Sequence, residues 1–84
     1  MQIRYSQKFK KQFKKMPKFA QDKFEERLNL FLMEPNHPTL RNHKLSGKYH
    51  LHRSINITGD YRLIFTRTET ILDLESIGTH SQLY

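Results

Sequence analysis

The sequence contains no cysteine, which excludes a disulfide framework and a zinc site built on thiolates. It also lacks any apolar run near the roughly 20 residues that a helix needs to span a bilayer. The N-terminal segment MQIRYSQKFKK has no apolar core of the kind found in signal peptides. We therefore expect a soluble cytoplasmic protein that does not engage a membrane.

Acidic residues are scarce. Eight Asp and Glu stand against fifteen Lys and Arg, which gives a net charge of +7 and a pI near 9.9. Much of the excess lies in residues 36–62, where five Arg or Lys and four His accompany the single acid Asp60. Neutralising phosphate is the commonest use of such an excess, so we expect a nucleic-acid partner. The alternative is a basic surface that serves only solubility.

The first half of the chain has the pattern of one strand and two helices. Alternation over residues 2–5 indicates a short strand, and Ser6 can cap a helix over residues 8–16. Pro17 suits the first turn of a second helix, which the next two prolines end near Met33. Apolar residues repeat along one face of each helix. The expected core positions are Phe9, Phe13, Met16, Phe19, Ala20, Phe24, Leu28, Phe31 and Leu32.

After a basic connection over residues 34–48, the period changes to two. Residues 49–57 predict a strand whose odd positions face the core and whose even positions form an open polar face. Gly59 is expected to supply a positive φ in the following turn, and strands over residues 61–67 and 71–77 complete a meander. The order of elements predicts one α+β domain over residues 1–84. It has two layers: an N-terminal strand, a two-helix hairpin and an antiparallel three-strand meander.

Two histidines, His50 and His52, share a face of the strand predicted over residues 49–57. Imidazoles at this spacing can bind a metal, with His43 or His80 completing the set. No cysteine and no suitably spaced acid accompanies them, so we expect no metal and no cofactor. Contacts to RNA phosphate or to a partner are the preferred interpretation.

The chain closes with IGTHSQLY, which places His80 and Tyr84 in a short polar tail. Metal-free RNA cleavage needs one group to take the 2′-OH proton, a cation beside the phosphorane and a group to protonate the 5′-oxygen. Imidazole can move a proton either way near neutral pH. His43, Asp60, Arg62 and His80 are a sufficient set, with Tyr84 as a stacking surface for a base.

Several of these residues have structural alternatives. Arg62 can form an ion pair with Asp60 or another nearby acid, Asp73 or Glu75, and Asp60 can serve as a turn former. Tyr61 is as compatible with the core as with stacking on a base. Besides Tyr84, the residues expected to contact RNA are Tyr61, Asn56, Lys44, Lys48 and Arg53.

Four segments, GKY (47–49), RSINI (53–57), GDYRLIF (59–65) and the closing IGTHSQLY, resemble toxins of the RelE/ParE superfamily, and most of all the YafQ-type mRNA interferases. The resemblance covers almost the whole chain. It implies a RelE-like fold and a type II toxin that cuts mRNA in the A site of the 70S ribosome. The implied cleavage is attack by the 2′-OH, leaving a 2′,3′-cyclic phosphate, and the implied partner is a cognate acidic antitoxin.

The resemblance also assigns roles to residues. His43, Asp60 and His80 match catalytic positions of the YafQ pattern, with His80 as the proton donor. Two aromatic positions of that pattern fall on Tyr61 and Tyr84, whereas Arg62 matches the transition-state arginine of the RelE branch. Asn56 stands where the pattern has a further histidine, and an amide can position a phosphate but cannot transfer a proton. A histidine of the same strand, at position 50 or 52, is the possible substitute.

Two other functions share these features. A ParE-like toxin binds DNA gyrase and has no nuclease chemistry, and a plain basic module binds nucleic acid without cutting it. Neither needs His43, Asp60 and His80 together, so the acid–base set favours the nuclease.

Overall fold

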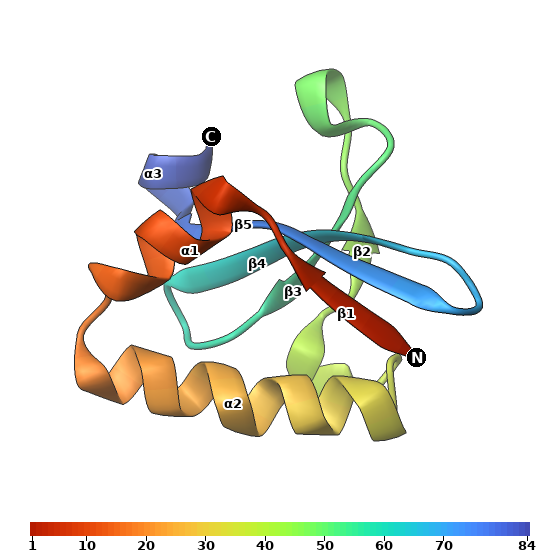
Figure 1. Cartoon of the computed structure of the whole chain (residues 1–84), viewed down its shortest axis with the longest axis horizontal. Coiled ribbons are helices and arrows are strands. Elements are labelled where there is room, and N and C mark those ends of the chain that lie inside the picture. Colours follow the sequence, from red (N-terminus) through yellow and green to blue (C-terminus); the bar gives the residue numbers. More distant parts are fainter.

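A five-stranded mixed sheet in the order β1-β5-β4-β3-β2 forms the centre of the molecule (Figure 1). The computed structural model describes residues 1–84. Strand β1 runs parallel to β5, and all other neighbours are antiparallel. The elements, in chain order, are β1 (Gln2–Tyr5), α1 (Gln7–Lys14), α2 (Lys18–Met33), the 3₁₀ turn η1 (Pro38–Leu40), β2 (His43–Lys44), the 3₁₀ turn η2 (Gly47–Tyr49), β3 (Arg53–Asn56), β4 (Tyr61–Arg67), β5 (Ile71–Thr79) and α3 (His80–Leu83).

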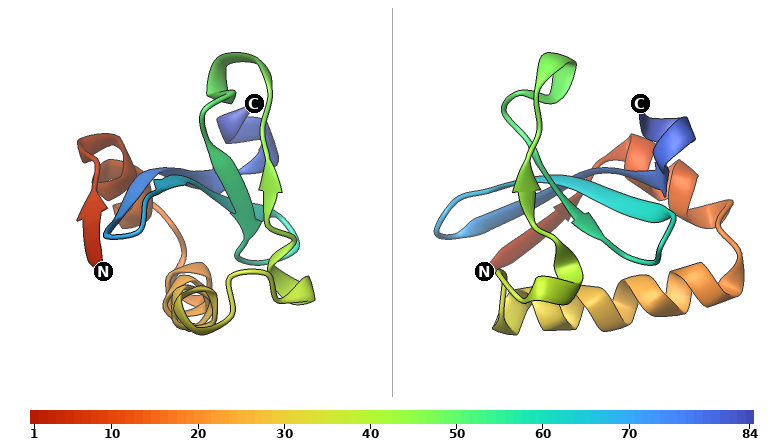
Figure 2. Two further views of the ribbon diagram at one scale, coloured as in Figure 1. Left: turned by 90° about the vertical axis from the view of Figure 1, so that its right-hand side faces the viewer. Right: turned by 180° about the vertical axis from the view of Figure 1, so that it is seen from behind.

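The predicted α+β fold is confirmed, with two additions. The expected connection over residues 34–48 contributes β2 at the edge of the sheet, and the expected polar tail forms α3. Helix α2 lies across one face of the sheet, while β2 and β3 extend into a hairpin that projects from the other (Figure 2). None of the helices has the length and apolar character needed to cross a membrane.

Local sequence explains where the two long helices begin. The Ser6 hydroxyl accepts a hydrogen bond from the backbone N–H of Phe9 at 2.9 Å and caps α1 as predicted. Pro17 lies at the cap position of α2 rather than inside its first turn. Helix α2 meets the sheet along one stripe, and each residue is rotated about 100° from the last. Phe19 and Leu32 therefore point away from the core and are 65% and 38% exposed, so their assignment to the core was wrong.

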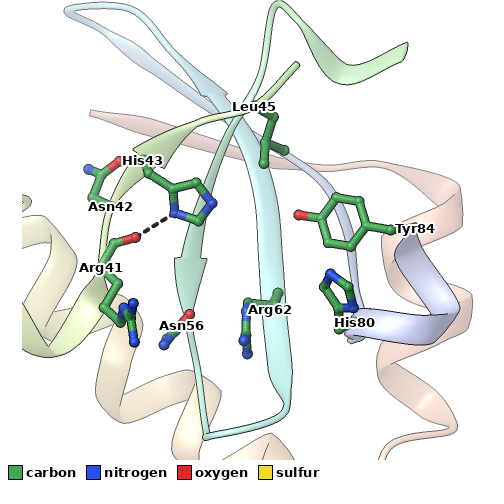
Figure 3. Close-up of a pocket in the computed structure, with 8 residues that line it drawn as sticks. All are labelled: Arg41, Asn42, His43, Leu45, Asn56, Arg62, His80 and Tyr84. Atoms are coloured by element: carbon green, nitrogen blue, oxygen red, sulfur yellow. Dashed lines mark hydrogen bonds between the residues drawn. The ribbon is translucent and has the colours of Figure 1, made fainter. Parts of the chain in front are cut away.

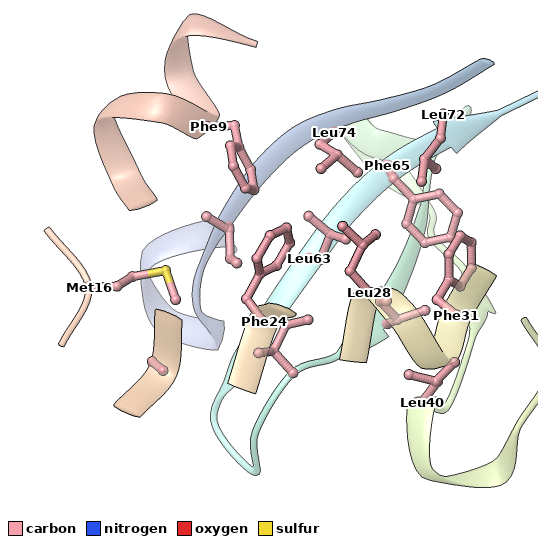
Figure 4. Packing of buried hydrophobic residues seen from close by; sticks show 14 residues of the cluster. Phe9, Met16, Phe24, Leu28, Phe31, Leu40, Leu63, Phe65, Leu72 and Leu74 are labelled. Atoms are coloured by element: carbon pink, nitrogen blue, oxygen red, sulfur yellow. The ribbon is translucent and has the colours of Figure 1, made fainter. Parts of the chain in front are cut away.

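The main core lies between α2 and the sheet (Figure 4). A bulge in β5 sets which residues enter it. Ile64 pairs with Ser76 and Phe65 pairs with Leu74, so one residue of β5 between them has no partner. The extra residue shifts the alternation, and Leu72, Leu74 and Ile77 all reach the core.

A second, smaller apolar cluster lies on the opposite face of the sheet. Tyr49, Ile64 and Leu83 form it and Leu45 packs against it, so the β2–β3 hairpin is joined to α3. The strand predicted over residues 49–57 was therefore wrong at its start, because Tyr49 ends η2 and β3 begins only at Arg53. Ser54 is fully buried, and Leu51, expected in the core, is 76% exposed.

The turn between β3 and β4 also differs from expectation. Gly59 has no positive φ, and Gly47 at the start of η2 is the glycine that adopts one, at 67°. The Thr58 hydroxyl accepts hydrogen bonds from the N–H groups of Asp60 and Tyr61, at 3.2 and 3.0 Å. A side-chain oxygen thus holds this turn, without left-handed backbone.

Candidate active site

An open pocket of about 650 Å³ lies between the β2–β3 hairpin and α3 (Figure 3). It occupies the sheet face opposite α2. Strands β2, β3 and β4 and helix α3 contribute its lining, together with residues on both sides of β2 and the residue after α3. The lining residues are Arg41, Asn42, His43, Leu45, Asn56, Arg62, His80 and Tyr84.

One wall is the short strand β2, which carries His43 opposite Ser54 of β3. The imidazole Nδ1 of His43 lies 2.7 Å from the backbone carbonyl oxygen of Arg41. Asn42 anchors the start of the strand: its amide donates to the Pro35 carbonyl at 3.0 Å, and its oxygen accepts from Arg53 Nε at 2.8 Å.

The floor consists of Asn56 and Arg62, which are register partners on β3 and β4 and lie side by side (Figure 3). Arg62 Nη1 donates to the Gly59 carbonyl at 3.1 Å. No acid pairs with Arg62, and Asp73 instead pairs with Arg4. The ion-pair alternative for Arg62 was therefore wrong, and its remaining N–H donors are available to an anion.

The opposite wall is α3, which a reciprocal capping box holds in place. The backbone N–H of Gln82 donates to the Thr79 hydroxyl at 3.3 Å, and the backbone N–H of Thr79 donates to the Gln82 side chain at 2.8 Å. This fixes His80 as the first helical residue. The ring centroids of His80 and Tyr84 lie 4.8 Å apart, with 43° between the ring planes. The rings of Tyr84 and Tyr49 form a T-shaped pair with their centroids 6.3 Å apart.

The charge of the pocket favours an anionic ligand. Two guanidinium groups and two imidazoles line it, and no Asp or Glu side chain does. A bidentate guanidinium is well suited to phosphate. The structure has no group of three or more His, Cys, Asp or Glu side chains arranged to hold a metal ion. The two histidines that were predicted on the strand both precede β3: His50 is exposed, and His52 packs against the Tyr49 ring.

Comparison with known proteins decides the family. Over residues 1–84 the chain matches the family described as "Bacterial toxin of type II toxin-antitoxin system, YafQ". The chain belongs to the YafQ toxin family. A search of curated protein sequences gives no significant match.

Solved structures agree with the YafQ assignment. The crystal structure of YafQ from E. coli strain BL21(DE3) is 26% identical, with a TM-score of 0.81 over 98% of this chain and 96% of that one. YafQ in the E. coli DinJ-YafQ toxin-antitoxin complex is 27% identical, with a TM-score of 0.79 over 98% and 94%. The YoeB/ParE toxin from Agrobacterium tumefaciens, at 13% identity and a TM-score of 0.78 over 95% and 99%, shows the shared fold alone.

The structure brings together five of the residues that the YafQ resemblance and the chemistry had singled out. His43, Asn56, Arg62, His80 and Tyr84 all line the pocket. They come from β2, β3, β4 and α3, so their proximity depends on the sheet order and on the second apolar cluster.

Five other predicted residues lie outside the pocket lining. Asp60 is exposed in the turn before β4. Tyr61 is on the core face of β4, against the main core and edge-on to Phe19 at 6.4 Å, so the core alternative describes its placement. Lys44 and Arg53 are register partners one step from His43, so their side chains leave the other face of the sheet. Lys48 lies over the Tyr49 ring, 5.1 Å from its centroid.

Three lining residues were not predicted from the sequence, Arg41, Asn42 and Leu45, although a signal was present for two of them. Positions 41, 43 and 45 alternate, so a strand through His43 puts Arg41 and Leu45 on the same face as the imidazole. The closing Thr79-His80-Ser81-Gln82 is likewise a capping-box sequence. It would have predicted a helix at His80.

Proposed function

We propose that this YafQ-family toxin is an endoribonuclease that cuts mRNA in the ribosomal A site by metal-independent acid–base chemistry. One observation carries the proposal: imidazoles stand on opposite walls of an open pocket whose floor holds a guanidinium and an amide (Figure 3). Cleavage by a neighbouring 2′-OH requires two proton-transfer groups and a cation between them. His43, Arg62 and His80 match that arrangement.

In the proposed reaction, the 2′-oxygen attacks the adjacent phosphorus and gives its proton to one imidazole. The bond from phosphorus to the 5′-oxygen breaks, and His80 protonates that oxygen as it leaves. Arg62 stabilises the phosphorane charge, and Asn56 donates hydrogen bonds to the phosphate. A 2′,3′-cyclic phosphate and a free 5′-hydroxyl result, and Tyr84 stacks on a neighbouring base.

Asp60 has a different place in this scheme. Its turn includes Gly59, whose carbonyl holds Arg62 at 3.1 Å. We propose that Asp60 acts through the shape of this turn. Lys44 and Arg53 leave the hairpin on the face away from the pocket, and Lys48 lies at its η2 turn. All three are proposed to hold RNA phosphates beyond the scissile one, where the RNA passes the β2 edge of the sheet.

The openness of the site supports the proposed dependence on the ribosome. His43, His80 and Tyr84 are exposed, and only two of the eight lining residues, Leu45 and Tyr84, are hydrophobic. Holding a flexible RNA in line for attack is a large part of the barrier. We propose that the ribosome supplies this alignment and the toxin supplies the acid–base groups.

An antitoxin is the second proposed partner. One structural relative is YafQ in the E. coli DinJ-YafQ toxin-antitoxin complex. With a net charge of +7, this chain suits an acidic cognate antitoxin. A small acidic reading frame beside the gene is the corresponding expectation.

The test adds purified protein to translating ribosomes with a defined mRNA and maps the new 3′ ends and their termini. We expect cuts within the A-site codon and a loss of roughly 10²- to 10⁴-fold in His80→Ala, the range for a proton-transfer group. His50→Ala, an exposed histidine outside the pocket lining, is the matched control and should cut like the parent chain. Growth inhibition that survives His80→Ala without A-site cuts would favour gyrase binding or plain nucleic-acid binding instead.

A further inference from the structure

The contact between His43 and Arg41 specifies where the proton of the imidazole resides. His43 Nδ1 lies 2.7 Å from the Arg41 carbonyl oxygen, which is a short hydrogen bond. A carbonyl oxygen can only accept, so Nδ1 must carry the proton. The neutral ring then has its lone pair on Nε2, and Figure 3 shows this second nitrogen turned toward the pocket.

The backbone of Arg41 makes this contact possible. Arg41 follows η1 in the left-handed conformation, with φ 47° and ψ 49°, and is the one non-glycine residue with a positive φ. Its N–H donates to the Pro38 carbonyl at 3.2 Å, and the next residue, Asn42, is tied to Pro35. A left-handed arginine is strained, and such strain is concentrated at functional sites. Here it directs a carbonyl at an imidazole.

We propose that Arg41 is a positioning residue whose left-handed backbone holds His43 in the Nδ1–H form, so that Nε2 of His43 is the general base. This inference rests on the proposed nuclease function and divides its proton transfers between the two histidines. Nε2 takes the 2′-OH proton while the O2′–P bond forms. The resulting imidazolium keeps its Nδ1–H group, which donates a charge-assisted hydrogen bond to the Arg41 carbonyl oxygen.

His80, unlike His43, has no hydrogen bond that holds its ring in one tautomer. Neither of its ring nitrogens hydrogen-bonds to the protein, and its ring contacts Tyr84. Nothing within the chain therefore fixes its tautomer. It is free to present a proton to the 5′-oxygen as the P–O5′ bond breaks.

The chain contains its own control for the tautomer. His37 Nδ1 accepts a hydrogen bond from the backbone N–H of Thr39 at 3.1 Å, so its proton must lie on Nε2. His37 and His43 should therefore be opposite tautomers in one molecule. His50, whose Nδ1 is 3.2 Å from the Gly47 carbonyl, makes a longer version of the His43 contact.

The experiment is a long-range ¹H–¹⁵N NMR spectrum of the free full-length chain at a pH where imidazole is neutral. It distinguishes protonated from unprotonated ring nitrogens by their ¹⁵N shifts. We expect Nδ1–H for His43 and Nε2–H for His37. A His43 spectrum with the proton on Nε2 overturns the inference, and no RNA, ribosome or variant is needed for that result.

Two variants then isolate the backbone of Arg41, because both remove the guanidinium. Arg41→Gly permits a positive φ, whereas the β-branched Arg41→Val opposes it. We expect Arg41→Gly to keep the Nδ1–H form of His43 and Arg41→Val to lose it. The cleavage rate of Arg41→Val should be about tenfold lower than that of Arg41→Gly. A general base contributes roughly 10²- to 10⁴-fold to the rate, and a misdirected base should lose part of that contribution.

The outcomes separate the two proposals. An unchanged tautomer in Arg41→Val overturns the positioning role of its backbone. The expected tautomers together with no ribosomal cleavage by the parent chain would leave the hydrogen bond in place, but would overturn both the nuclease function and the assignment of His43 as its base.

Discussion

At the scale of single residues, Asn56 stands where the resemblance implies a further histidine. It lies beside Arg62 on the pocket floor, where both side chains can donate to the same phosphate. An amide cannot move a proton at neutral pH. In the proposed reaction, proton transfer is therefore divided between His43 and His80, with Asn56 and Arg62 stabilising charge.

This division can be tested at position 56. Asn56→Ala removes hydrogen bonds to an anion, each worth about 1.5–3 kcal/mol, so ribosomal cleavage should fall roughly 10- to 100-fold. Asn56→Asp keeps the shape of the side chain but adds a negative charge where phosphate binds, and it should be at least as damaging. Rates follow from single-turnover cleavage on programmed ribosomes. Full activity in Asn56→Asp would remove this residue from the anion site.

At the scale of secondary-structure elements, hydrophobic periodicity predicted the long elements and missed the short ones. Helix α2, with Ala20 and Phe24 on its buried stripe, and strand β4 form where the pattern placed them. Strand β2 has only two residues, His43 and Lys44, too few for hydrophobic periodicity to predict it. The predicted start of β3 was wrong for another reason. Tyr49 lies in η2 and is buried because it packs in one cluster with Leu83 of α3, a contact that no local pattern encodes.

The same limit applies to the site. Chemistry alone selected His43, Arg62 and His80, because few other side chains can transfer protons or hold phosphate near neutral pH. Their proximity depends on the pairing of β2 with β3 and on the second apolar cluster, in which Leu83 of α3 packs with residues of the hairpin. These contacts are distant in sequence. The left-handed backbone at Arg41 is likewise a tertiary property, since arginine has no preference for it.

The attachment of α3 gives an element-scale prediction. A Cβ at Gly78 would lie 2.8 Å from Gln82 Oε1, the atom that accepts the N–H of Thr79 in the capping box. Gly78→Ala should therefore displace Gln82 and shift the helix that carries His80. Gly59→Ala is the matched control, because a Cβ there meets nothing within 4 Å and its φ is not positive.

Both substitutions restrict the unfolded chain, which stabilises by about 0.4–1 kcal/mol, but only Gly78→Ala loses a cap, at about 1 kcal/mol. Urea unfolding should therefore find Gly59→Ala the more stable of the two variants. Ribosomal cleavage should drop about tenfold in Gly78→Ala alone, by misplacement of a proton-transfer group. Equal cleavage by both variants would show that α3 tolerates loss of its cap.

The edge strand β1 gives a prediction about pH. Arg4 and Asp73 are register partners on β1 and β5, joined by two hydrogen bonds of 2.6 and 2.8 Å. The hydrogen bonds from Arg4 are the main cause that lowers the pKa of Asp73 below 3.8. A lowered pKa means that this stabilisation is present above the unfolded value and is lost as the pH falls through the folded one.

Asp73→Asn should accordingly have a lower urea midpoint than the parent chain at neutral pH. The effect should be modest because the pair is exposed. The difference should shrink as the pH falls below 3.8, and also as salt is added at neutral pH. A difference that is constant across that pH range would assign the effect of the substitution to packing rather than to charge.

At the scale of the whole molecule, the main core and the pocket lie on opposite faces of the sheet. One face packs against α2 and carries most of the core, while the other carries the pocket. Two pairs of lysines carry positive charge in different places. Lys10 and Lys14 of α1 border a groove with Phe9 and Phe13 outside the pocket, whereas Lys44 and Lys48 lie on the β2–β3 hairpin. If the pocket holds RNA, the hairpin pair should meet neighbouring phosphates and the α1 pair should not.

Two double variants of equal charge change separate these surfaces: Lys44→Gln with Lys48→Gln on the hairpin, and Lys10→Gln with Lys14→Gln on α1. The measurement is the affinity of the free chain for a short single-stranded RNA across a range of salt. Each lost phosphate contact should reduce the slope of log affinity against log salt by about 0.7, so we expect a shallower slope for the hairpin pair. The α1 pair should keep the parent slope, since charge lost far from bound phosphate releases no counterions from the RNA. Equal slopes for both pairs would mean that RNA responds to the net charge of the molecule rather than to the surface around the pocket.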